Sequence, residues 1–110
     1  MEAQRLVQAT CPDCRGPLSE VQEGGLVQFR CLVGHRYSPR SLLETHSETQ
    51  ESALWGAVVA LEEAANLVHA VAPYVPRALA DRLKEQAAEK LRQAAKVRRI
   101  LEELAPFQVE

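Results

Sequence analysis

Three cysteines and one histidine near the N-terminus form two pairs whose spacing is typical of a metal site. Cys11 and Cys14 enclose two residues, and His35 follows Cys31 by four positions. Two thiols at the first spacing can bind one tetrahedral ion from a single tight turn, and the second pair can supply the other two ligands. An odd number of cysteines in a reducing compartment also favours metal over disulfides. The sequence therefore predicts a Zn²⁺ site with four protein ligands.

This ligand set predicts a structural rather than a catalytic metal. A catalytic zinc keeps one coordination position open for water, and four protein ligands leave none. Asp13 between the two thiols is read as a turn residue rather than a general base, and His46 is kept as an alternative to His35 as fourth ligand. The chain contains no nucleophile elbow or glycine-rich phosphate loop. We expect no enzymatic activity, and a zinc hydrolase would require an open coordination site.

The segments around the ligand pairs predict a small β-sheet. Residues 18–22 and 26–30 alternate with a period near two, and Gly24 and Gly25 between them supply the positive φ that a tight hairpin turn demands. Residues 5–9 predict a short leading strand. The hairpin lies between the two ligand pairs, so a bound ion would pin both of its ends. A sheet this small needs the free energy of metal binding to fold.

Two helices are expected after the sheet. Ser38 followed by Pro39 is a helix start, although the polar stretch 45–52 predicts a kink or restart near Ser47. Apolar residues then recur at steps of three and four as far as residue 72, and again over 77–104. Helices with so short a connection must run antiparallel. The predicted fold class is α+β: a zinc-ribbon β-hairpin over residues 1–40 and a long antiparallel helical hairpin over residues 41–110, together one structural unit.

The window of residues 53–61 is apolar on all sides of its helix. It is too short to cross a membrane and too apolar for one face of a two-helix hairpin. Either the ribbon packs back on this window or a second copy of the chain covers it. We expect a homodimer, with an interface formed by Leu54, Trp55, Val58 and Val59.

Composition and charge limit the classes of partner. The chain has 110 residues, 46% of them hydrophobic, and a formal net charge of −2, so nothing draws it as a whole to nucleic acid or to an anionic membrane. The alternative function is a nucleic-acid-binding zinc ribbon that uses the basic residues of the second helix, but acidic residues share that helix. No secretory signal or run of about eighteen apolar residues is apparent. We expect a cytoplasmic protein.

Several motifs together resemble a known module, namely the C-terminal extension of some chemotaxis protein-glutamate methylesterases. The matching residues are Cys11-Pro12-x-Cys14-x-Gly16-x-Leu18, Phe29-Arg30-Cys31-x-Val33-Gly34-His35-x-Tyr37-Ser38, Ser41-Leu42-Leu43, Glu51-x-Ala53-Leu54-Trp55-x-Ala57 and Leu61-Glu62-Glu63. The resemblance covers residues 11–63, and the serine-containing catalytic domain and the receiver domain of that family have no counterpart here. It therefore implies an accessory interaction module with a signalling protein partner in chemotaxis-type or two-component signalling, and no methylesterase activity.

Overall fold

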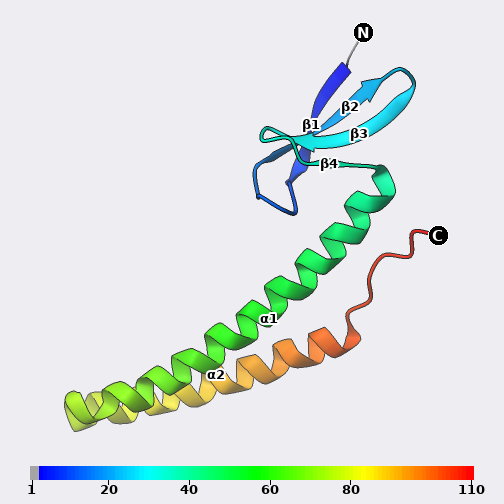
Figure 1. The fold of residues 1–110 in the computed structure, drawn as a ribbon. Helices are drawn as coiled ribbons and strands as arrows, with labels where there is room; N and C mark the ends of the chain where they lie inside the picture. Colours follow the sequence, from blue (N-terminus) through cyan, green and yellow to red (C-terminus); the bar gives the residue numbers. More distant parts are fainter. Residues whose placement is uncertain (1–2) are drawn as a thin grey trace. The chain divides into compact units, whose positions relative to one another are not determined.

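The computed structural model describes residues 3–110, which form a four-stranded antiparallel sheet followed by two helices (Figure 1). The elements are β1 (Ala3–Thr10), β2 (Pro17–Glu23), β3 (Leu26–Cys31), β4 (Arg36–Tyr37), α1 (Pro39–Val71), the 3₁₀ turn η1 (Ala72–Tyr74) and α2 (Arg77–Glu103). The predicted α+β class is confirmed. The chain divides within α1 into two compact units. The sheet unit comprises the four strands, the start of α1 as far as Thr49, and the C-terminal residues Pro106–Glu110. The helical unit comprises Gln50–Ala105.

The sheet is a meander in which each strand pairs with the next one along the chain. The predicted hairpin forms as β2 and β3, and the glycines at its turn, Gly24 and Gly25, have φ of +60° and +81°. The predicted leading strand also forms, as β1 beside β2. The short strand β4 was not predicted; it pairs Phe29 with Tyr37 and extends the sheet beyond the hairpin.

The core of the sheet unit is very small. Cys11, Leu18, Cys31 and Tyr37 are buried together, and Phe29 and Leu42 pack against them. Two of these four buried side chains are predicted metal ligands. Because so little apolar surface is removed from water, the apolar contacts alone are a weak source of stability for a unit of this size.

Helix α1 begins where the sequence predicts but does not restart at Ser47. The Ser38 hydroxyl accepts a hydrogen bond from the Ser41 backbone N–H at 3.0 Å, which caps the first turn. The predicted restart is wrong, because a single helix runs from Pro39 to Val71. The Ser47 hydroxyl donates to the Leu43 carbonyl at 3.0 Å, so it bonds within the helix instead of capping a new one.

The helical unit is an antiparallel hairpin whose buried residues recur every seven positions. Val58 and Ala65 of α1 are buried, as are Ala80, Ala87 and Ala94 of α2. A seven-residue repeat keeps one seam of each helix facing the other, and alanine lets the two backbones approach closely. Glu62 and Arg98 form an ion pair between the helices at 3.0 Å. The predicted helical hairpin is confirmed.

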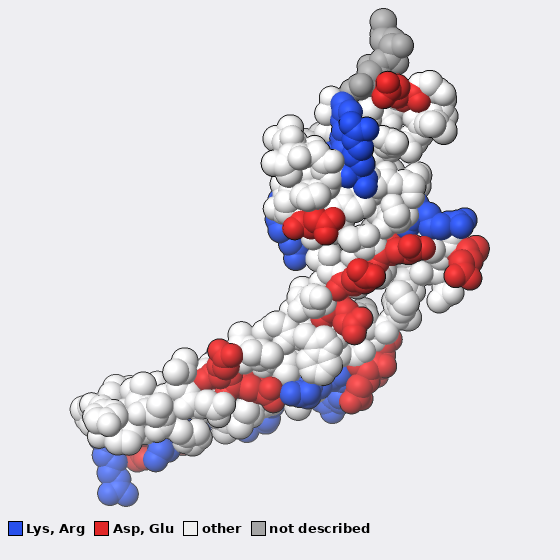
Figure 2. Space-filling model, viewed as in Figure 1, with Lys and Arg blue, Asp and Glu red and all other residues white. Residues whose placement is uncertain are grey.

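The segment Pro39–Tyr74, which comprises α1 and η1, is long and apolar enough to cross a membrane by length and composition. This differs from our expectation that no apolar run approaches the length of a span. Only 11% of its most apolar window is buried within the chain. One such helix is a weak indication of a span, because core helices of soluble proteins have the same composition. Uncharged atoms cover much of the visible face of α1 toward its C-terminal end (Figure 2).

Replacing Ser38 with alanine should lower the free energy of unfolding by about 1 kcal/mol, because the first turn of α1 loses its side-chain cap. Ser52, an exposed residue inside the same helix, is the matched control. Alanine has the higher helix propensity, so Ser52→Ala should leave stability unchanged or raise it slightly. Urea unfolding followed by circular dichroism measures both variants. Equal effects of the two substitutions would contradict the assigned cap.

Candidate metal centre

The four predicted ligands converge on one point of the sheet unit. The three sulfurs and one imidazole nitrogen of Cys11, Cys14, Cys31 and His35 all lie within 4.8 Å of one another. The His35 Nδ1 atom is 3.3 Å from the Cys31 sulfur and 3.7 Å from the Cys11 sulfur. The usual bond lengths of tetrahedral zinc place its ligand atoms about 3.5 to 3.8 Å apart. The group can therefore hold a metal ion, and its donors and spacing are compatible with zinc.

The first pair lies in a tight loop between β1 and β2. The Arg15 N–H donates to the Cys11 carbonyl and the Cys11 N–H donates to the Gly16 carbonyl, both at 2.8 Å. The Gly16 N–H then points at the Cys14 sulfur at 3.4 Å. A Cβ atom at Gly16 would lie only 3.3 Å from that sulfur. The loop thus turns both thiols toward one point and leaves little room for a side chain beside the second.

The second pair lies where β3 turns back into β4. The Cys31 N–H donates to the His35 carbonyl at 3.1 Å, and the Gly34 N–H donates to the Cys31 carbonyl at 3.3 Å. Gly34 has a φ of +104°, a backbone conformation that favours glycine. The His35 N–H donates to the Cys31 sulfur at 3.3 Å. This turn brings the imidazole back over the thiol four residues earlier.

The surroundings of the three thiols differ. Desolvation opposes ionisation of Cys31 and by itself would raise its pKa. This effect is outweighed by hydrogen bonds from backbone N–H groups, chiefly that of His35, and from the Cys14 side chain. The Cys31 pKa is lowered to about 7 as a result. The pKa of Cys11 is also lowered: desolvation is again outweighed, chiefly by the hydrogen bond between its sulfur and the Tyr37 hydroxyl. The pKa of Cys14 is raised, because the lowering effect of the Gly16 N–H is exceeded by desolvation and the other two thiols. Two of the three thiols are therefore prepared to act as thiolate ligands.

The structure adds two residues to the site that the sequence did not assign to it. The Tyr37 hydroxyl lies 3.2 Å from the Cys11 sulfur and also donates a hydrogen bond to the Asp13 carboxylate. Burial and these two contacts raise the pKa of Tyr37. Asp13 was expected to be only a turn residue, and its carboxylate instead links the first loop to β4. No local pattern in the sequence marks Tyr37 as part of the site, because it lies in a strand of only two residues.

The other predicted site residues are placed as follows. His46, the alternative fourth ligand, does not belong to the cluster formed by the described residues. Of the predicted interface residues, Val58 is fully buried inside the helical unit, Leu54 is partly buried, and Trp55 and Val59 are 45% and 49% exposed. The Arg98 guanidinium lies over the Trp55 ring, 5.4 Å from its centre, and covers part of it.

Comparisons with protein-family models, with curated proteins and with solved structures find no match to this chain.

Metal affinity should fall steeply as the pH drops below about 7. The Cys31 pKa is about 7, so this thiol is largely ionised above pH 7 and largely protonated below pH 7. At the lower pH values the thiol must lose its proton before it can bind a metal ion. Each ligand that must lose a proton adds roughly a tenfold loss of affinity per pH unit. Above pH 7 the dependence should be shallower, because Cys31 is already ionised there, and it should include Cys14, whose pKa is raised.

Competition with a chromophoric chelator, in steps from about pH 5.5 to about pH 8.5, measures this dependence. The chelator's own proton affinity is measured in parallel as the control. An affinity that does not change over this range would contradict thiolate ligation.

Proposed function

We propose that this chain is a non-enzymatic zinc-binding interaction module. The observation that carries the proposal is the convergence of Cys11, Cys14, Cys31 and His35 within 4.8 Å. Four protein donors fill a tetrahedral shell, so the metal has a structural role and no position for a substrate or an activated water. The free energy of metal binding then stabilises the folded state of the sheet unit.

Zinc is the metal that this donor set fits best. Three thiols and one imidazole form a soft, tetrahedral shell, which suits zinc better than calcium or magnesium, whose ligands are oxygens. An iron site of the rubredoxin type would use four thiolates, and the described cluster offers three. The three cysteines are free thiols, which is consistent with the cytoplasmic location that we propose.

We further propose that the module self-associates through the exposed apolar side of α1. Trp55, Val59, Leu67 and Val71 are 45%, 49%, 63% and 43% exposed. Their positions differ by four or eight residues, so they form a stripe that winds around the helix by about 40° for every four residues, with Glu63 between Val59 and Leu67. A second copy would present the same stripe, and pairing the two would give a four-helix bundle. Glu62 and Glu63 interrupt the most apolar part of α1, which favours a protein partner over a bilayer.

A link to chemotaxis-type or two-component signalling is supported by the sequence resemblance over residues 11–63. On this proposal the module presents its helices to a signalling protein, and the metal keeps the sheet folded. The catalytic and receiver domains that perform the known chemistry of that family have no counterpart in this sequence, so the proposal includes no methylesterase activity.

The alternative of nucleic-acid binding through α2 has little support from the ion pairs of the helical unit. Arg92 pairs with Glu89 at 2.6 Å, and Arg98 pairs with Glu62 at 3.0 Å. Basic side chains that are already paired with carboxylates gain less from contact with phosphates. We therefore do not expect nucleic acid to be a partner.

Native mass spectrometry of the purified chain should show one zinc ion per copy, and Cys14→Ser or His35→Ala should strongly reduce the zinc content, because water replaces a protein ligand and the affinity falls. His46→Ala is the matched control, since it removes a histidine outside the cluster and should leave the zinc content unchanged. The two ligand variants should also lose the cooperative unfolding of the sheet unit. Retention of zinc by both ligand variants, or loss of zinc by His46→Ala, would refute the assigned ligands.

The same spectra should show a dimer that Trp55→Ala and Val59→Glu weaken by about tenfold or more, because each removes or charges a central apolar contact. Tyr74→Ala is the control: Tyr74 is 87% exposed, lies in the same unit and is outside the stripe. Because Trp55 also contacts Arg98, helix content is measured for every variant. A monomer at all concentrations would exclude self-association, and binding to lipid vesicles instead would make the stripe a membrane contact.

A further inference from the structure

The connection between α1 and α2 is an exposed run of apolar residues. None of its members is buried, and the run consists of Ala70, Val71, Ala72, Pro73, Tyr74, Val75 and Pro76. Tyr74 is 87% exposed and Val71 is 43% exposed. Connections between helices usually carry polar turn residues, and a run of exposed apolar residues is unfavourable in water unless it serves a contact. We call residues 70–76 the hairpin tip.

Basic residues gather beside the hairpin tip, although the chain as a whole has a net charge of −2. No acidic residue occurs from position 64 to position 80. Residues 77–84 then contain one acidic and three basic residues, namely Asp81, Arg77, Arg82 and Lys84. Pro73 and Val75 of the tip line one hollow together with Arg77, Asp81 and Lys84. Figure 2 shows the end of the helical hairpin largely without charge on the visible face, with Lys and Arg side chains along one edge.

The basic side chains that line this hollow are not compensated by ion pairs. Within the part of the chain that the structure describes, Arg77 and Lys84 form none, so Asp81 shares the hollow with both but pairs with neither. Farther along α2, by contrast, Arg92 and Arg98 are each paired with a glutamate. The charges of Arg77 and Lys84 are therefore available to an external anion.

We propose that the hairpin tip inserts into the surface of an anionic lipid membrane. An aromatic ring such as that of Tyr74 favours the boundary between the headgroups and the acyl chains. Apolar side chains gain free energy on insertion, and basic residues beside them are attracted to anionic headgroups. Asp81 lies one turn into α2, about 6 Å from the start of the helix at Arg77. Insertion is therefore shallow, in keeping with the depth of about 5 to 10 Å that is typical of interfacial elements.

The small size of this apolar surface favours a lipid surface over a protein partner. A stable protein interface uses roughly 20 to 30 residues on each side, whereas the tip comprises only residues 70–76 and the helix beside it is charged. Glu62 and Glu63, which argue against burial of the middle of α1 in a bilayer, lie outside the tip. The inference requires neither the metal nor the dimer, and Val71 is the one residue that the tip shares with the proposed stripe.

The test is sedimentation of the full chain with vesicles of phosphatidylcholine, either alone or with added phosphatidylglycerol. We expect saturable binding to the anionic vesicles that added sodium chloride weakens, because salt screens exposed charges. Tyr74→Glu should weaken this binding about tenfold or more, since it removes the ring and places a negative charge in the tip. Arg77→Gln and Lys84→Gln should each weaken it about fivefold, the contribution of one basic residue near an anionic surface.

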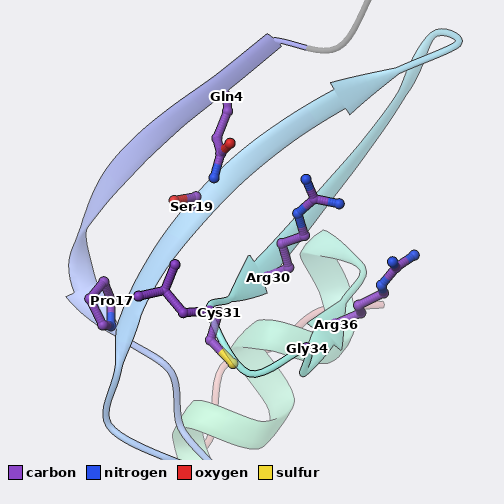
Figure 3. Close-up of a pocket in the computed structure, with 8 residues that line it drawn as sticks. Gln4, Pro17, Ser19, Arg30, Cys31, Gly34 and Arg36 are labelled. Carbon is purple, nitrogen blue, oxygen red and sulfur yellow. The ribbon is translucent and has the colours of Figure 1, made fainter.

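Leu91→Glu is the matched control for Tyr74→Glu. It makes the same change in charge at an exposed apolar residue, about 20 Å along α2 from the start of the helix, so it should leave vesicle binding unchanged. Arg36→Gln is the control for the loss of a positive charge, because Arg36 belongs to the sheet unit, where it lines the hollow shown in Figure 3. Helix content and native mass are measured for every variant, so that neither unfolding nor loss of the dimer is mistaken for loss of membrane contact.

A loss of binding in Tyr74→Glu that Leu91→Glu does not share would support insertion of the tip. No binding to anionic vesicles at low salt would overturn the proposal, as would equal losses in these two variants. Equal binding to both kinds of vesicle would exclude attraction by the basic residues, and with it an anionic lipid surface as the partner. Binding that survives Tyr74→Glu but is lost in Val59→Glu would make the stripe, and not the tip, the membrane contact.

Discussion

The sheet unit is organised around one point at which three thiols and an imidazole from distant segments of the chain converge. Cys11 and His35 are 24 residues apart in sequence, and their side-chain atoms lie 3.7 Å apart. The two loops that carry the ligands are the connections of β1 to β2 and of β3 to β4. Among the described residues, the buried cluster beside them consists of Cys11, Leu18, Cys31 and Tyr37, and two of these are proposed ligands. With zinc bound as we propose, the order of the sheet would depend on the metal at least as much as on apolar packing.

This dependence extends to the contacts that surround the ligands. The backbone of each loop donates N–H groups to a sulfur, and Tyr37 connects the Cys11 thiol to Asp13. Such outer contacts orient metal ligands and tune their basicity. They also make the strand β4 part of the metal centre, although it is only two residues long. The pairing of β4 with β3 in turn sets the position of Arg36 on the opposite face.

Much of the fold follows from local sequence signals because those signals act over short distances. The glycine pair at the hairpin turn, the Ser38 cap and the prolines between the helices each constrain a few neighbouring residues, and each occurs where the pattern indicates. The convergence of Cys11, Cys14, Cys31 and His35 was also predictable, because two cysteine-containing pairs at these spacings are typical of tetrahedral metal sites. Other features depend on contacts between distant residues. The strand β4 is too short to have a periodicity, and the link from Tyr37 to Asp13 joins this strand to the connection between β1 and β2.

The incorrectly predicted restart of α1 has a similar origin. Serine and threonine hydroxyls can cap a new helix or bond back to the preceding turn, and the sequence pattern is the same in both cases. In the folded chain, Ser47 is buried and accepts a hydrogen bond from the Phe107 N–H at 3.2 Å. A contact with a residue sixty positions later cannot be inferred from the local pattern. The regularly spaced alanines of α2, by contrast, indicate a helix seam from the sequence alone.

The hydrogen bond between Phe107 and Ser47 shows that the chain returns to the sheet unit after completing the helical hairpin. Residues 50–105 are thus, in topological terms, an insertion into the sheet unit, with both of their attachment points on it. An insertion of this kind can change in length without altering the unit that carries it. Because the hairpin seam repeats every seven residues, matched additions of seven residues to α1 and α2 would preserve the seam. The reach of the helices can therefore evolve independently of the metal centre.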